Sequence, residues 1–282
     1  MHRTFDYINL TLIFTTYTRG VRAAAAVIVV ALLVPQAHGA NWAVNEARRY
    51  GNDFKAVVLA PEHWNRADWG RAALTIGTIA VLMREDEHIA HEVQAHRNST
   101  TDSISKNITP FGGGRGLQLS VAILGVGLLT KNHEVRDTGR DAIESSIIAA
   151  GIITPLLKKG FGRARPIQDE HKPFDFDPGS MQESFPSGHA TNAFAIASAI
   201  AGHSKGWVIP TLAYGVASTV AFSRMNDNVH WASDVFTGAV IGTATGKMLV
   251  HRHQMVATRR AEWSFTPMIG KRGAGFLIRV HE

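Results

Sequence analysis

Six apolar segments constrain the fold of this chain more than any other feature. They are rich in small residues, lack the strict alternation of a half-buried strand, and are long enough for three or more helical turns. Strand and helix patterns do not alternate along the chain, so a parallel α/β sheet is not expected. The sequence therefore predicts an all-α fold, a bundle of packed helices, over residues 72–83, 117–129, 142–157, 190–201, 207–222 and 235–250.

The lengths of these segments also bear on the relation to a membrane. Most are shorter than the ~20 residues that span a bilayer, and polar residues such as Glu144 and Lys247 interrupt them. We therefore predict a soluble or peripheral helical bundle. A multi-pass membrane protein is the alternative.

The N-terminal forty residues resemble an export signal. Arg19 and Arg22 precede an apolar run over 23–34, and small residues around Gly39 and Ala40 provide a cleavage site. The competing interpretation is an uncleaved anchor, although the run is short for a membrane span. We expect a cleaved signal over 1–40, export to the periplasm, and a single helical domain over 41–282.

Composition narrows the classes of partner. The formal charge is +6 and the sequence pI is near 9.8, which favours anionic partners such as phosphate esters or a membrane surface. The charges do not form a basic stripe interleaved with aromatic residues, so nucleic acid is not an expected partner. Cysteine is absent, which excludes disulfides, thiolate catalysis and cysteine-bound metal. The sequence does not indicate an oligomeric state.

The C-terminal tail differs from the rest of the chain. Two short apolar runs, 263–269 and 276–280, flank the glycine-rich stretch 270–275. This pattern predicts a short β-hairpin within 262–281. We expect it to cap or pack against the helices and assign it no chemistry.

Residues 223–234 contain the first candidate for catalysis. Arg224 precedes His230, and Asp234 follows His230 by four residues. At a helix start this spacing places the carboxylate beside the imidazole, where it can accept the Nδ1 proton and leave Nε2 free as nucleophile or base. An ordinary surface helix can have the same spacing, so this stretch alone does not distinguish a catalytic pair from an ordinary one.

A second candidate precedes the apolar run 190–201. Ser187 is a plausible N-cap, so the amides of Gly188 and His189 would point out of a helix N-terminus, where an anion is favoured. The alternative is a capped helix with an incidental histidine.

A third candidate ends the apolar run 142–157. Gly160, Gly162 and Pro166 break helical geometry, so Lys158 and Arg165 are expected on a bend that directs both into one cleft. Basic residues at a helix C-terminus also simply complement its dipole.

Taken together, the three stretches resemble one family signature. Lys158 with Arg165–Pro166, then Pro186–His189, then Ser223–Arg224 with His230 and Asp234 match in order and spacing the three-part signature of the type 2 phosphatidic acid phosphatase superfamily. Bacterial class A acid phosphatases and vanadium haloperoxidases are members of the same superfamily. The resemblance covers about residues 140–252, the expected catalytic core, and implies a helical bundle of this kind.

The resemblance implies a role for each matched residue. His230 would attack phosphorus and form a phosphohistidine, with Asp234 orienting its ring. His189 would protonate the leaving oxygen and then activate water. The remaining matched groups would hold the phosphate oxygens: Lys158, Arg165, Arg224, the Ser187 hydroxyl and the Gly188 amide. The residues alone leave open which histidine is the nucleophile, and the resemblance assigns that role to His230.

No metal or other cofactor is expected in this site, because lysine and arginine supply the positive charge. The segment 86–96 is rich in Asp, Glu and His, but His91 and His96 are five residues apart, which puts them about 140° apart on a helix. We expect this segment to be a solvated charged face. The other histidines, including His133, His203, His251 and His253, are expected on the surface.

The sequence thus predicts a metal-independent phosphomonoesterase, exported and acting on a soluble phosphorylated molecule or on a lipid phosphate. Membrane-surface contact and a multi-pass lipid-diphosphate phosphatase are left open. A vanadate-dependent haloperoxidase is an alternative from another class, since a cationic pocket binds either oxyanion. A catalytically inactive scaffold or phosphate-binding protein is disfavoured, since every matched catalytic position is present.

Overall fold

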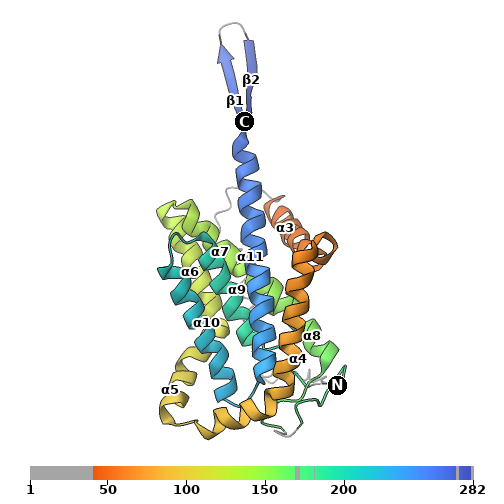
Figure 1. Cartoon of the computed structure of the whole chain (residues 1–282). Coiled ribbons are helices and arrows are strands. Elements are labelled where there is room, and N and C mark those ends of the chain that lie inside the picture. Colours follow the sequence, from red (N-terminus) through yellow and green to blue (C-terminus); the bar gives the residue numbers. More distant parts are fainter. Residues whose placement is uncertain (1–40, 169–171, 181, 271–272, 281–282) are drawn as a thin grey trace, which may run out of the picture. The chain divides into compact units, whose positions relative to one another are not determined.

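The computed structural model describes residues 41–168, 172–180, 182–270 and 273–280 (Figure 1), so the predicted export signal over 1–40 lies outside the described part. The chain divides into two compact units, residues 1–52 and 53–282. Helix α3 (Asn41–Val58) begins in the first unit and its last residues open the second. The extent of a single helical domain over 41–282 stays a prediction.

The six apolar segments within 72–250 lie in helical stretches, apart from Trp207 directly before its helix, so the prediction of a helical bundle is confirmed. Residues 142–157 are shared by α7 (His133–Ser146), the π-helical turn η3 (Ile147–Ile153) and α8 (Thr154–Phe161). The apolar segments did not predict α5 (Ser99–Ile108) or the two 3-10 turns, η1 (Ala60–His63) and η2 (Thr109–Gly112). The other helices of the second unit are α4 (Arg66–Ala95), α6 (Gly114–Thr130), α9 (Gly188–His203), α10 (Val208–Asn226) and α11 (Ala232–Glu262).

Local side-chain chemistry explains several helix boundaries. Asn65 and Asn98 begin α4 and α5 with capping boxes, because each side chain accepts backbone hydrogen bonds and the third helical residue bonds back to the cap. Gly162 ends α8 at a φ of 58°, and a Cβ there would lie 1.8 Å from the carbonyl oxygen of Asp177. Only glycine fits this turn. The predicted break after Lys158 is therefore present, although Gly160 still lies inside the helix.

Helix α9 is the central element of the second unit. It packs against α7, α10 and α11, and most of its side chains are buried. Many of them are alanine, so neighbouring helices approach closely. On α11 the approach is closest at three glycines one turn apart, because a Cβ at Gly238, Gly242 or Gly246 would lie 2.5, 2.2 or 2.7 Å from backbone oxygens of Ser187, Thr191 or Ala195. This seam fixes the start of α11 against the start of α9.

In the part of the chain that the structure describes, no single helix is long and apolar enough to cross a bilayer. The segments Ser99–Gly112 and Gly114–Thr130 meet the length and composition criteria only as a pair, and the pair is bent by 53° at its break.

The tail continues from α11 as two strands, β1 (Trp263–Gly270) and β2 (Gly273–Val280), which pair antiparallel with Trp263 opposite Val280 and Gly270 opposite Gly273.

Two histidines depart from the sequence-based expectation. His203 and His253 were expected on the surface, but their side chains are only 9% and 19% exposed and both contact the buried Asp141. The prediction was wrong because the partners lie far away in sequence, 62 and 112 residues from Asp141. A local pattern does not reveal such pairs.

Candidate active site

His230 and Asp234 lie together at the start of α11. Both side chains are buried, and His230 Nδ1 is 3.6 Å from Asp234 Oδ2. The predicted one-turn proximity is present, but the distance is that of an ion pair and exceeds a normal hydrogen bond. The helix begins at Ala232, so His230 lies just before it and does not open it.

Asp234 is held by other donors. Its Oδ2 accepts from the Ser184 hydroxyl at 2.5 Å and from the Trp231 amide at 2.9 Å, and its Oδ1 accepts from Arg163 at 2.6 Å. Burial pushes the pKa of Asp234 up, but the neighbouring His230 and the Arg163 charge outweigh it and hold that pKa below its ordinary value. Asp234 is therefore ionised at neutral pH.

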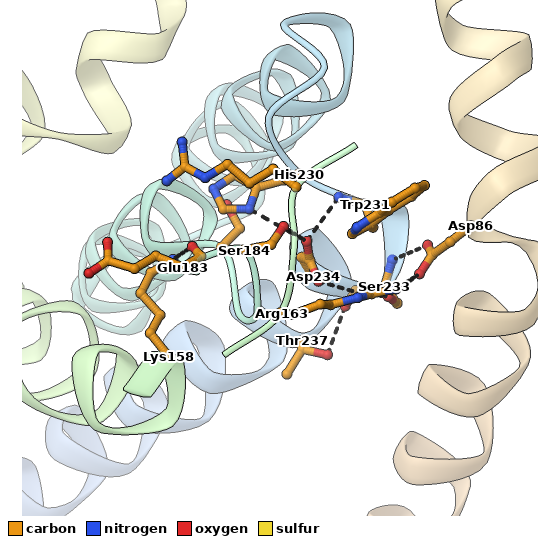
Figure 2. A network of polar contacts seen from close by, with 12 residues as sticks. Asp86, Lys158, Arg163, Glu183, Ser184, His230, Trp231, Ser233, Asp234 and Thr237 are labelled. Atoms are coloured by element: carbon orange, nitrogen blue, oxygen red, sulfur yellow. Dashed lines mark hydrogen bonds and ion pairs between the residues drawn. The ribbon is translucent and has the colours of Figure 1, made fainter. Parts of the chain in front are cut away.

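Arg163 connects Asp234 to a second carboxylate, Asp86 (Figure 2). Its Nη1 donates to Asp234 and to the Ser233 hydroxyl, while its Nη2 lies 2.7 Å from Asp86 Oδ2. The Asp86 Oδ1 also accepts from the Ser233 amide at 2.9 Å. The side chains of Arg163, Asp86 and Asp234 have no exposed area, so this is a buried carboxylate–guanidinium–carboxylate chain.

This chain corrects the expectation for residues 86–96. Asp86 was placed on a solvated charged face, but it is fully buried and faces Arg163, whereas His88, His91 and His96 are exposed as expected. Burial raises the pKa of Asp86 while the Arg163 charge opposes that shift. Sequence reasoning missed both residues, since Arg163 lies between the matched Lys158 and Arg165 and Asp86 lies 77 residues before it.

Two of the predicted cations, Lys158 and Arg165, lie close enough to His230 to act on its charge. Lys158 lies in the last turn of α8, its Nζ donates to the Glu183 carbonyl, and its Cε is 3.9 Å from where a Cβ of Gly188 would be. Burial and, to a smaller extent, the charge of Arg165 lower the pKa of Lys158 to about 8. The charge of Arg165 also acts on His230 and on Arg224, so these groups share one electrostatic environment.

Arg224 lies near the end of α10. One of its terminal nitrogens donates to Asp227 at 2.9 Å and to the Thr109 hydroxyl at 3.3 Å. Its Nε is buried and makes no hydrogen bond among the described residues. Arg224 therefore keeps a donor available for an anion.

The start of α9 supplies further donors. Ser187 is the N-cap as predicted, but its hydroxyl makes no capping bond and is buried without a partner among the described residues. The Ser187 amide donates to the Asp234 carbonyl at 3.0 Å, which ties this helix start to α11. Because the hydroxyl has no partner among the described residues and lies at a helix N-terminus, this position suits an anion.

His189 lies in the first turn of α9 against a glycine run that sequence reasoning did not use. A Cβ at Gly113 would be 3.5 Å from His189 Nε2, and one at Gly112 would be 2.8 Å from the His189 carbonyl. A side chain at Gly112 would therefore clash with the His189 backbone, and one at Gly113 would touch the imidazole. The signal was visible as three consecutive glycines, 112–114, at the start of α6.

The electrostatics of the site favour a neutral His230. Burial lowers the pKa of His230 to about 4; the charges of Lys158 and Arg165 act in the same direction, and Asp234 opposes them. A neutral imidazole with Nδ1 toward a carboxylate has a lone pair on Nε2. The arrangement therefore combines a nucleophilic nitrogen with cationic and amide donors for an anionic group.

The region that holds these residues is similar in sequence to known proteins. The family model of the PAP2 superfamily matches residues 143–257, the region that contains every predicted site residue. Sequence similarity to curated proteins covers about a third of the chain. A lipid A 1-phosphatase of Porphyromonas gingivalis is 37% identical over 94 residues, which are 32% of this chain and 18% of that protein. A lipid A 1-phosphatase of Rhizobium etli is 31% identical over 102 residues, 35% of this chain and 43% of that protein.

The matched region thus spans less than half the length of these curated relatives. Among solved structures, the crystal structure of Aquifex aeolicus LpxE aligns with a TM-score of 0.47 at 22% identity, covering 58% of this chain and 93% of that one. The family match ends at residue 257, so the C-terminal hairpin has no support from these relatives.

Proposed function

We propose that this chain, whose residues 143–257 belong to the PAP2 superfamily, is a phosphatase that hydrolyses a lipid phosphate monoester. The observation that carries the proposal is a buried, neutral His230 close to the charges of Lys158 and Arg165, with Arg224 in turn close to Arg165. Such a site stabilises the negative charge of a phosphoryl group during transfer. The similarity to two lipid A 1-phosphatases supports a lipid as the carrier of the phosphate.

In the proposed mechanism His230 Nε2 attacks phosphorus while the bond to the ester oxygen breaks. His189 donates a proton to that oxygen, so the lipid leaves as an alcohol and a phosphohistidine remains. His189 then takes a proton from water, the water oxygen attacks phosphorus, and inorganic phosphate leaves with His230 restored. Asp234 keeps the proton of His230 on Nδ1, and Arg163 with Asp86 keeps Asp234 in place.

The phosphate oxygens would be held by the Ser187 hydroxyl and the Arg224 Nε, two buried groups that have no hydrogen-bond partner among the described residues. The Gly188 amide at the helix start would add a third donor. Lys158 and Arg165 add positive charge. Since these residues supply the cationic charge that a metal provides elsewhere, we propose that the reaction needs no metal ion.

Membrane association is part of the proposal. Large apolar side chains are exposed on several helices of the second unit, and Leu74 of α4, Leu129 of α6 and Leu212 of α10 are 74%, 86% and 65% exposed. Exposed apolar area of this extent suits contact with lipid, and the net positive charge suits an anionic membrane surface. Export to the periplasm rests on the signal predicted over 1–40.

Phosphate release by the full chain in detergent tests the function. A lipid phosphate monoester in mixed micelles is compared with a small soluble phosphomonoester, with and without a chelator. We expect faster release from the lipid, activity that survives the chelator, and loss of both activities in His230→Ala. Equal or better use of the soluble ester would instead identify a broad-specificity acid phosphatase, and release that does not depend on His230 would contradict the assigned mechanism.

A further inference from the structure

A second buried polar cluster lies far from the phosphate site along α11. His253 is 21 residues after the first residue of that helix, which corresponds to about 30 Å along the helix axis. None of the cluster's residues takes part in the proposed reaction. Its members come from α3, α7, the end of α9 and the second half of α11: Asp53, Asp141, Glu144, His203, Arg252 and His253.

Three carboxylates are buried in this cluster. Asp53, Asp141 and Glu144 are 2%, 2% and 0% exposed. Carboxylates at such depth occur paired with cations or bound to metal ions, because an isolated buried charge is very costly. Carboxylate oxygens of Asp53 and Glu144 also lie within 4.8 Å of each other, and two buried negative charges at this separation repel unless a cation lies beside them.

One nitrogen and two oxygens converge within the cluster. His253 Nε2 lies 3.1 Å from Asp53 Oδ2 and 4.0 Å from Glu144 Oε2, and one ligand atom from each residue falls within 4.8 Å of the others. Bonds of about 2.0–2.2 Å to a tetrahedral metal ion separate its ligand atoms by roughly 3.3 Å. The three atoms thus need only small side-chain adjustments to share one ion.

The surrounding hydrogen bonds orient these three ligands. His253 Nδ1 is 2.7 Å from Asp141 Oδ1, which directs Nε2 toward Asp53 and Glu144. Arg252 Nε donates to Asp53 Oδ1 at 2.6 Å, and His203 Nε2 lies 2.7 Å from Asp141 Oδ2. A histidine that binds a metal through one nitrogen and a carboxylate through the other is the usual arrangement in metal sites.

We propose that Asp53, Glu144 and His253 bind a divalent transition-metal ion of the zinc or manganese class. One imidazole with two carboxylates suits these ions, whereas magnesium and calcium prefer oxygen ligands alone. The ion joins α3, α7 and α11. Because it lies about 30 Å along α11 from the phosphate site, it stabilises the helix packing and takes no part in phosphoryl transfer.

Metal binding by the full chain tests this site. The detergent-purified protein is stripped with a chelator, the chelator is removed, and Zn²⁺, Mn²⁺ or Mg²⁺ is titrated by calorimetry. We expect one Zn²⁺ or Mn²⁺ per chain, no comparable Mg²⁺ binding, and a higher unfolding midpoint in the metal-bound protein. Glu144→Gln, nearly equal in shape, should abolish this binding, and Asp141→Asn should weaken it about 10- to 100-fold.

Two matched controls separate this site from other histidines. His251→Ala removes an exposed imidazole two residues away on the same helix, and His189→Ala removes one from the phosphate site. Both should bind Zn²⁺ as the wild type does. If the wild type binds neither Zn²⁺ nor Mn²⁺ more tightly than Glu144→Gln, or if either control loses the binding, the assignment is wrong.

X-ray absorption at the zinc edge needs no variant, so it also decides the case in which Glu144→Gln fails to fold. A shell with a single imidazole and carboxylate oxygens would support the site. A shell with several imidazoles, or with water oxygens alone, would refute it.

Discussion

The two ends of α11 shift the pKa of histidine in opposite directions. At the helix start, His230 is buried beside Lys158 and Arg165, and its pKa falls to about 4. In the second half, burial also disfavours the charge on His253, but the hydrogen bonds to Asp141 and Asp53 outweigh it and raise the pKa of His253 to about 9. In the metal-free protein the same side chain is thus a neutral imidazole beside cations in one place and a cation among carboxylates in the other. Burial disfavours the charge on both histidines, and the charges of the neighbours decide whether that shift prevails.

Of the predictions that test this contrast, removal of His230 should have the largest effect on activity. We expect His230→Ala to lower kcat for phosphate release about 10⁴-fold or more, because the variant has no nucleophile. The control is His251→Ala, which removes an exposed imidazole of the same helix and should keep full activity. A loss below tenfold in a folded His230→Ala protein would show that another group attacks phosphorus.

A substitution in the carboxylate–guanidinium–carboxylate chain, which contacts His230 through Asp234, should lower activity less. We expect Asp86→Asn to lower kcat about 10- to 100-fold with little change in KM, since Asp86 touches no substrate and acts through Arg163 on Asp234. Glu85→Gln, a neighbouring exposed carboxylate, is the matched control. An unchanged kcat in folded Asp86→Asn would mean that Asp86 only stabilises the fold.

The cations at the phosphate site should appear in the pH profile. Because the pKa of Lys158 is about 8, the charge that attracts phosphate is lost above that pH, and kcat/KM should fall about tenfold per pH unit there. In Lys158→Arg the charge persists, so this alkaline limb should move to higher pH. If the limb stays at the same pH in the variant, another group produces it.

The smallest effect concerns stability at the other end of α11. His253 has an ordinary pKa of 6.5, and its folded-state pKa is raised to about 9. Its contribution is therefore fully present below pH 6.5 and is lost as the pH rises through 9. In metal-free protein the unfolding midpoint should fall by roughly 5 °C between these pH values, and by less in His253→Ala. If calorimetry shows that the unfolding midpoint falls equally with pH in both proteins, His253 does not carry the charge assigned to it.

The sequence predicted most of the helical architecture because its signals are local. Apolar runs marked the long helices, Ser187 marked the start of α9, and Gly162 marked the end of α8. The matched residues also lie near these boundaries, so spacing alone placed Lys158, His189 and His230 at helix ends. Their roles in the reaction stay predictions.

What the sequence did not reveal depends on contacts between distant segments. In sequence, Asp86 resembles its exposed neighbours in an acidic, histidine-rich stretch. Its burial is explained by the ion pair with Arg163, which lies far from it in the sequence. His253 likewise looks like a surface residue until Asp53 and Asp141 are brought to it by two other helices. Polar residues buried by tertiary pairing have no periodic signature.

The most direct test of the central claim is to trap the covalent intermediate. The protein is mixed with a lipid carrying ³²P in its phosphate, quenched with alkali within milliseconds, and digested for peptide analysis. The account predicts an alkali-stable, acid-labile label on the peptide that contains His230, absent from His230→Ala and retained longer in His189→Ala. Label on His189, or no protein-bound label under conditions where the lipid alcohol is released in a burst, would contradict it.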